Sequence, residues 1–167
     1  MPGPDLILPG FYGKLPQAGD FVTRRLPADF VRFWDRWCAR HLAARLPDGP
    51  ALRFALAQGP LRATGLVIAS ADRAGRRFPL TLAAPGTTAA DPAWLAALAA
   101  TASAAARGEL GPDALDARLR ALPLSAAEAP AAPPLALWLE GGAPQAIDPE
   151  RPEPLLDALL ALPAEAR

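Results

Sequence analysis

Apolar positions between residues 28 and 45 repeat with the spacing of an α-helix. Large apolar side chains recur every three or four residues in this segment, and charged side chains occupy positions between them. The sequence therefore predicts a helix over residues 28–45 that ends before the Pro- and Gly-rich segment 47–50. Its apolar stripe comprises Phe30, Phe33, Trp34, Trp37, Cys38 and Leu42, and its polar face carries Asp29, Arg32, Arg36 and Arg40. We expect Trp34 and Trp37 to anchor a core, with an exposed aromatic cage as the less favoured interpretation.

Three shorter segments after this helix have the patterns of β-strands. Residues 53–57 alternate, and residues 61–70 include a stretch that is apolar on both faces, as is typical of a central strand. In residues 78–82, Phe78, Leu80 and Leu82 are expected on one face and Thr81 on the other. The short turns between these segments predict antiparallel pairing. One of these turns, at residues 72–76, is expected to hold Gly75 at positive φ.

The remaining segments extend this pattern into one α/β domain. We expect a strand at 11–15, helices at 91–108 and 112–122, a Pro- and Ala-rich loop at 123–134, a strand at 135–139 and a helix at 154–162. The order predicts a single domain over residues 1–167, a three-layer α-β-α sandwich around a mixed, largely antiparallel sheet. One core is expected to contain Phe30, Trp34, Trp37, Phe54, Ile68, Phe78, Leu80 and Leu82.

Charge and composition exclude several classes of partner. The 17 basic and 17 acidic side chains cancel, which argues against a nucleic-acid platform and an electrostatic membrane anchor. The N-terminal segment lacks the features of a signal peptide, and no long, strongly apolar run indicates membrane insertion. A cytoplasmic protein is the simplest expectation.

Candidate catalytic and metal-ligating groups are scarce in this sequence. A single cysteine, Cys38, and a single histidine, His41, permit neither an intrachain disulfide nor a zinc site. We expect Cys38 to be a buried, inert thiol, and His41 to be at the surface or half-buried rather than a metal ligand. The Gly10-x-x-Gly13-Lys14 segment lacks the spacing of a phosphate-binding loop. The sequence therefore predicts no catalytic residue, metal or cofactor, and a protein that is not an enzyme.

Two glycine-containing segments, at residues 10–22 and 70–82, carry the remaining charged candidates. Binding groups gather on loops, so we expect a partner surface formed by Lys14, Asp20, Asp72, Arg73 and Arg76. Arg24, Arg25 and Arg77 belong to the same group of candidates. The competing interpretation, structural ion pairs within the fold, is about equally favoured.

The same two segments resemble the type VI secretion-associated TagF family. The resemblance covers about residues 9–84. Ala18 stands where the family usually has Arg or His, and Trp34-Asp35-Arg36-Trp37 lies between the two motifs in the expected order. The residues that form the motifs are Tyr12, Gly13, Pro16, Gly19, Phe21, Trp34, Trp37, Gly75, Phe78 and Pro79.

The resemblance implies an accessory protein of the bacterial type VI secretion system. Such proteins act in the cytoplasm as post-translational regulators, generally repressors, of secretion-apparatus assembly through protein–protein contacts. The implied partners are secretion components, the forkhead-associated scaffold protein among them. An alternative is a domain that senses a small ligand or anion between the two glycine-containing loops. A third hypothesis is a hydrolase built on Asp20 or Asp72.

Overall fold

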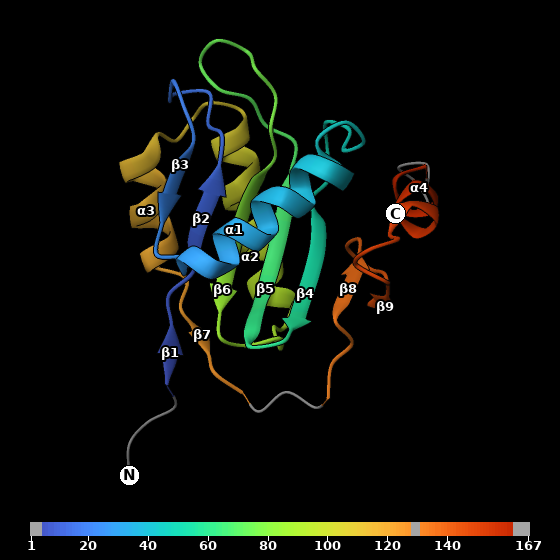
Figure 1. Cartoon of the computed structure of the whole chain (residues 1–167). Coiled ribbons are helices and arrows are strands. Elements are labelled where there is room, and N and C mark those ends of the chain that lie inside the picture. The colour runs from blue at the N-terminus through green and yellow to red at the C-terminus, as the bar shows by residue number, and fades with distance from the viewer. Residues whose placement is uncertain (1–4, 128–130, 162–167) are drawn as a thin grey trace.

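One antiparallel sheet organises the fold (Figure 1). The structure is a computed structural model, and it describes residues 5–127 and 131–161. Within these residues the sheet has seven strands in the order β3-β2-β6-β5-β4-β8-β9. Their bounds are β2 Gly10–Gly13, β3 Val22–Arg24, β4 Leu52–Gln58, β5 Leu61–Ile68, β6 Leu80–Pro85, β8 Leu135–Trp138 and β9 Gln145–Ala146. A second, two-stranded sheet pairs β1 (Leu6–Ile7) with β7 (Leu124–Ser125).

The predicted α/β class is confirmed, but the prediction of a mixed sheet is wrong. Every described strand pair is antiparallel. A parallel pair needs a crossover connection, usually one helix, that returns the chain to the same end of the sheet. Here two helices, α2 (Pro92–Ala106) and α3 (Pro112–Arg120), separate β6 from β8, and β8 pairs antiparallel with β4.

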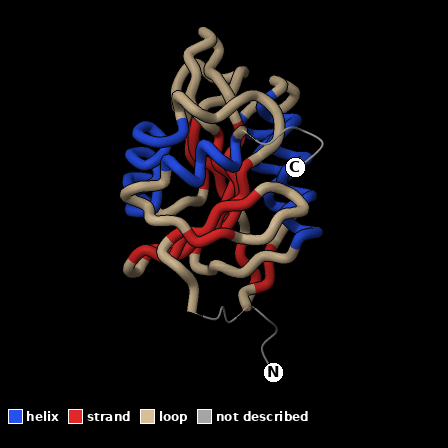
Figure 2. Tube along the Cα trace, turned by 90° about the vertical axis from the view of Figure 1, so that its right-hand side faces the viewer, coloured by secondary structure: helices blue, strands red, loops and turns tan. Residues whose placement is uncertain are grey.

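The strands direct alternate side chains into two separate cores. Leu52, Phe54 and Leu56 of β4 share the first core with α1 (Ala28–Trp37) and α4 (Glu153–Leu160). Leu66 and Ile68 of β5 share the second core with α2 and α3. Helices lie on both sides of the strands in Figure 2.

The prediction of a single core is therefore wrong. Ile68, Leu80 and Leu82 lie in the second core, whereas Phe78 lies in the first. Phe78 does not share a face with Leu80 because β6 begins only at Leu80, after the irregular segment that contains Pro79. Thr81 faces the first core, where its hydroxyl accepts a hydrogen bond from Trp34.

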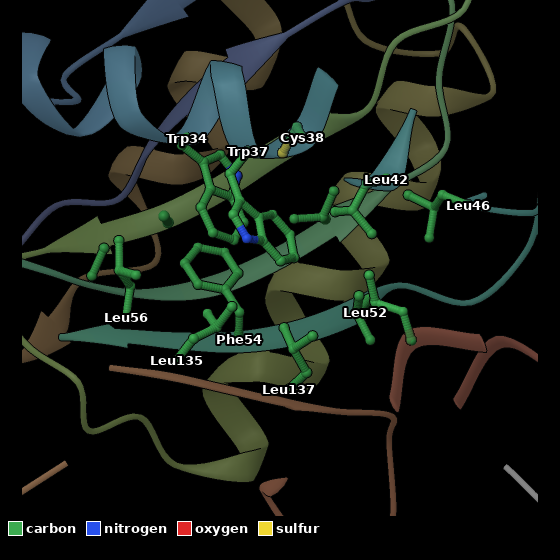
Figure 3. Packing of buried hydrophobic residues seen from close by; sticks show 14 of the residues in the cluster. Trp34, Trp37, Cys38, Leu42, Leu46, Leu52, Phe54, Leu56, Leu135 and Leu137 are labelled. Atoms are coloured by element: carbon green, nitrogen blue, oxygen red, sulfur yellow. The ribbon is translucent and has the colours of Figure 1, made fainter. Parts of the chain in front are cut away.

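Stacked aromatic rings fill the first core (Figure 3). The ring of Trp34 lies 4.3 Å from that of Phe54 and 5.0 Å from that of Trp37, centroid to centroid. Both tryptophans are buried, which confirms the expectation that they anchor a core.

The first helix ends earlier than the sequence predicts. α1 stops at Trp37, and residues Cys38–Leu42 continue as a π-helical turn, η1, in which the Ala43 backbone N–H donates to the Cys38 carbonyl. An α-helix and a π-helical turn both keep the apolar positions of this segment facing the sheet, so the apolar periodicity could not distinguish them.

The later elements follow the predictions, with two corrections. The Asp91 side chain caps α2 by accepting from the Trp94 backbone N–H. The loop predicted over residues 123–134 contains strand β7, and its residues 128–130 lie outside the described part. α4 begins one residue earlier than predicted, and the predicted end at residue 162 also lies outside that part. Among the described residues, no helix combines the length and apolar character needed to cross a membrane.

Candidate functional site

The two glycine-containing loops lie side by side because β2 and β6 are neighbouring strands. The first loop, residues 14–21, follows β2, and the second loop, residues 69–79, precedes β6. Two hydrogen bonds to backbone carbonyls join them: the Ser70 hydroxyl donates to the Lys14 carbonyl at 2.7 Å, and the Arg73 backbone N–H donates to the Ala18 carbonyl at 2.8 Å. The structure thus brings the two predicted segments into one unit, called here the loop pair.

Exposed arginine side chains add further contacts between the loops. Arg73 Nη2 donates to the Gln17 carbonyl at 2.6 Å, and Arg76 Nη2 donates to the Gly19 carbonyl at 3.1 Å. Each guanidinium therefore crosses from the second loop to the first while most of its remaining donors face solvent.

The second loop contains the turn predicted from the sequence. An antiparallel bridge between Ala71 and Arg77 closes it, and the Gly75 backbone N–H donates to the Asp72 carbonyl at 2.9 Å. Gly75 has φ of 84°, which confirms the expectation of positive φ at this position.

Asp72 is the electrostatic centre of the loop pair. Its Oδ1 accepts from the backbone N–H groups of Ala74 and Arg76, and its Oδ2 lies 3.3 Å from Lys14 Nζ and 2.8 Å from Arg76 Nε. The Asp72 side chain is 0% exposed and that of Lys14 is 11% exposed. Burial alone would raise the pKa of Asp72, but the Arg76 backbone N–H, Lys14 and the Arg76 guanidinium outweigh it and lower the pKa.

The aromatic ring of Phe21 lies beside the ammonium group of Lys14. Its Nζ lies 5.0 Å from the centroid of Phe21, a cation–π distance. Phe21 stacks on Tyr12 and meets the edge of Phe78, yet 43% of Phe21 remains exposed. The Tyr12 hydroxyl donates to Asp35 at 2.5 Å, and burial together with that carboxylate raises the pKa of Tyr12.

The five predicted binding residues therefore divide into two groups. Lys14 and Asp72 form a buried ion pair, which is the structural role that the sequence left open. Arg73, Arg76 and Asp20 are exposed, and Asp20 accepts only from the Phe21 backbone N–H among the described residues. The outer surface of the loop pair thus carries two guanidinium groups, a carboxylate and part of an aromatic ring.

The motif glycines and prolines shape the loops. A Cβ atom on Gly13, which has φ of 141°, would lie 2.2 Å from the Pro79 carbonyl oxygen. Gly13 therefore allows the two loops to approach at their base. Pro16 packs near Gly108, and Gly19 lies in open space.

The other charged candidates pair within the fold. Arg24 and Arg25 form ion pairs with Asp113 and Asp116 of α3. Arg77 donates to Asp48 at 2.7 Å. Sequence reasoning missed the acceptor roles of Asp35 and of the Gln17 carbonyl, because each partner lies more than 20 residues away in the chain.

His41 differs from its predicted position. Cys38 is buried as expected, and burial raises the pKa of its thiol. The prediction that His41 is at the surface or half-buried is wrong, because its side chain is only 3% exposed. Its Nδ1 lies 2.7 Å from Glu153 Oε1, so α4 supplies the polar partner that permits burial. The described residues contain no cluster of three or more side chains that could hold a metal ion.

A cavity beside the loop pair is too small for an organic ligand. It holds about 10 Å³ and is lined in part by Ser70, Phe78 and Pro79. This volume corresponds to about one water molecule.

Comparison with known proteins gives the family. The family model described as TagF N-terminal domain, type VI secretion system-associated, matches residues 10–122. The crystal structure of PA0076 from Pseudomonas aeruginosa PAO1 is similar, with 29% identity and a TM-score of 0.60 over 91% of this chain and 76% of that one. No curated protein matches the chain. The chain belongs to the family of TagF N-terminal domains, which is associated with the type VI secretion system.

Proposed function

We propose that this domain is a non-enzymatic, cytoplasmic regulator that represses assembly of the type VI secretion apparatus by binding one of its components. The forkhead-associated scaffold protein is the first partner to test. Family membership supports the association with type VI secretion. The binding surface we assign is the exposed side of the loop pair.

The observation that carries this proposal is the rigid construction of the loop pair. A buried Lys14–Asp72 ion pair lies beneath it, and contacts from Arg73 and Arg76 fix the first loop against the second. A surface that is ordered before binding loses little conformational entropy when a partner arrives. Loops held in this way by a sheet are common positions for recognition groups.

The surroundings of Asp72 and Asp20 support binding rather than catalysis. Both oxygens of Asp72 already face donors, and its side chain is buried. A general base must reach a proton of the substrate, which this carboxylate is not placed to do. Asp20 is exposed, and among the described residues it accepts only from the Phe21 backbone N–H.

Charge reversal at Arg73 tests the surface. Arg73 is exposed, and its side chain donates only to a backbone carbonyl, so Arg73→Glu should preserve the fold while opposing a partner. In a host strain that expresses the variant in place of the wild type, we expect type VI secretion to be released while the melting temperature stays within about 2 °C of wild type.

A matched control separates binding from folding. Arg107→Glu reverses the charge of another exposed arginine, which pairs with Glu109, and should leave repression intact. Loss of the scaffold protein from pull-downs with Arg73→Glu, but not with Arg107→Glu, would identify the partner. A stably folded Arg73→Glu protein that represses secretion as well as wild type would rule out this surface.

A further inference from the structure

A groove beside the first helix lies apart from the loop pair. It holds about 360 Å³ and is lined by residues of α1, η1 and the segment that precedes α4, among them Phe33, Arg36, Trp37, Arg40, Pro149 and Glu150. This volume is within the range of protein binding sites. The groove combines aromatic walls with two guanidinium groups.

Hydrogen bonds between distant parts of the chain fix the walls of this groove. The Trp37 indole N–H donates to the Pro149 carbonyl at 2.9 Å, across 112 residues of sequence. His41 of η1 contacts Glu153 of α4. These contacts hold the segment at residues 149–150 against α1, so the groove exists before any ligand binds.

Arg36 and Arg40 line the groove, and Arg32 lies one helical turn before Arg36 on α1. Arg32, Arg36 and Arg40 are exposed, and none has an ion pair or side-chain hydrogen bond with a described residue. Arg45, on the next turn, does pair, with Asp157. Three adjacent unneutralised cations thus form a stripe along α1 and η1, the arginine stripe.

The length of the stripe favours an extended ligand. Residues four apart on a helix rise about 6 Å along its axis. Side chains on one side of an extended peptide are spaced by about 7 Å, twice the rise per residue of a strand. Alternate carboxylates of an extended chain therefore match successive guanidinium groups, whereas a compact anion reaches only part of the stripe.

We propose that this groove binds an extended acidic peptide segment of a partner protein, in which carboxylates at alternate positions pair with Arg32, Arg36 and Arg40. An apolar side chain at an intervening position points to the other side of the extended segment, toward the wall of the groove that contains Pro149. Guanidinium groups bind carboxylates in bidentate geometry, which gives the contact its preference for acidic side chains. This site is separate from the loop pair and does not depend on its function.

Glu150 is the acidic group at the groove that opposes such a ligand. It lines the groove, but its carboxylate forms no ion pair with Arg36 or Arg40. The proposal therefore predicts opposite effects for acidic and basic residues of one groove: removal of the Glu150 charge should strengthen binding, and reversal of the arginine charges should weaken it.

Fluorescence anisotropy with the full chain tests the site. The probe is a fluorescently labelled peptide with glutamate at every second position. The intervening positions are glycine, except for one central leucine. A second peptide has glutamine in place of each glutamate. We expect saturable binding of the acidic peptide that Arg36→Glu with Arg40→Glu weakens about tenfold or more. Glu150→Gln should strengthen it a few-fold, and salt should weaken it.

The matched control is Arg62→Glu with Arg118→Glu. Both arginines are exposed, lie on β5 and α3, and lack a side-chain partner among the described residues, so this variant has the same net charge as the groove variant. Equal weakening by both double variants would reveal non-specific attraction and overturn the proposal. Absence of binding to wild type, equal binding of the glutamine peptide, or equally tight binding of citrate at the groove would each overturn it as well.

Discussion

Trp34 makes both an apolar and a polar contact in the first core. Its ring is fully buried among Phe30, Trp37 and Phe54, and its indole N–H donates to the Thr81 hydroxyl at 2.8 Å. Replacement by alanine removes the ring contacts and leaves a cavity. We expect Trp34→Ala to lower the free energy of unfolding by about 3–5 kcal/mol, measured by urea denaturation.

Thr81→Val tests the polar contact separately. The substitution keeps the volume but removes the acceptor, so a buried indole N–H loses its partner at a cost of about 1–3 kcal/mol. If both variants unfold at the wild-type urea midpoint, Trp34 is not a core residue and the aromatic-cage interpretation becomes the better one.

Asp72 should make the free energy of unfolding depend on pH in the acid range. Its pKa is lowered in the folded protein, so its charged form stabilises the fold above the unfolded-state value of about 3.9. That contribution is lost as pH falls through the lowered pKa. We expect the difference in unfolding free energy between wild type and Asp72→Asn to be largest near neutral pH and to shrink below about pH 4.

A matched acid provides the control for this pH series. Asp113 pairs with Arg24 at an exposed position, with 96% of its side chain accessible, so Asp113→Asn should change stability little at any pH. A wild-type advantage over Asp72→Asn that stays constant from pH 7 to below the lowered pKa would contradict the role of the buried carboxylate.

The sequence identified Lys14 and Asp72 as candidate residues, but it could not decide between a binding role and a structural role. Lys14 and Asp72 belong to the two glycine-containing segments, where binding and structural pairing leave the same sequence pattern. The two residues are 58 positions apart, and only the pairing of β2 with β6 brings them to 3.3 Å. Burial, which decides between the roles, is a consequence of that long-range pairing.

At the scale of elements, two glycines with positive φ differ in the space around them. A Cβ on Gly13 would collide with the Pro79 carbonyl, whereas nothing lies within 4 Å of a Cβ on Gly75. Gly75→Ala should therefore cost only backbone strain, about 1 kcal/mol, and Gly13→Ala should cost more because the loop pair must separate. Thermal unfolding of the two variants gives the comparison, and equal losses would contradict the close approach at Gly13.

Long periodic segments were predictable, and short strands were not. The start of α1 and the β4–β5 hairpin follow directly from apolar spacing and turn residues. β1, β3, β7 and β9 contain only two or three residues each, too few to show alternation. They form because a partner strand or a turn places them, as Phe11 pairs opposite Arg24.

At the scale of the whole molecule, the sheet separates two cores, whereas the sequence predicted a single core. Apolar residues on both faces of β5 and β6 indicated central strands but not which helix covers which face. That assignment depends on the pairing of strands far apart in sequence. It also brings the C-terminal segment into the first core, although the family match ends at residue 122.

The final prediction concerns this C-terminal segment. Leu137 of β8 is 1% exposed and pairs with Phe54 of β4, and Leu156 of α4 lies in the same core. The segment that follows the family match should therefore be required for folding. We expect Leu137→Ala to lower the free energy of unfolding by about 2–5 kcal/mol, measured by urea denaturation.

A chain that ends after Leu122 should fail more completely than this point variant. It loses β8 and α4, leaves β4 as an unprotected sheet edge, and exposes the ring of Phe54, so it should aggregate and show no cooperative melting. Size-exclusion chromatography and circular dichroism provide the measurements. A monomeric, cooperatively melting chain of residues 1–122 would show that the first core forms without the C-terminal segment 123–167, and that the residues shared with the family suffice for the fold.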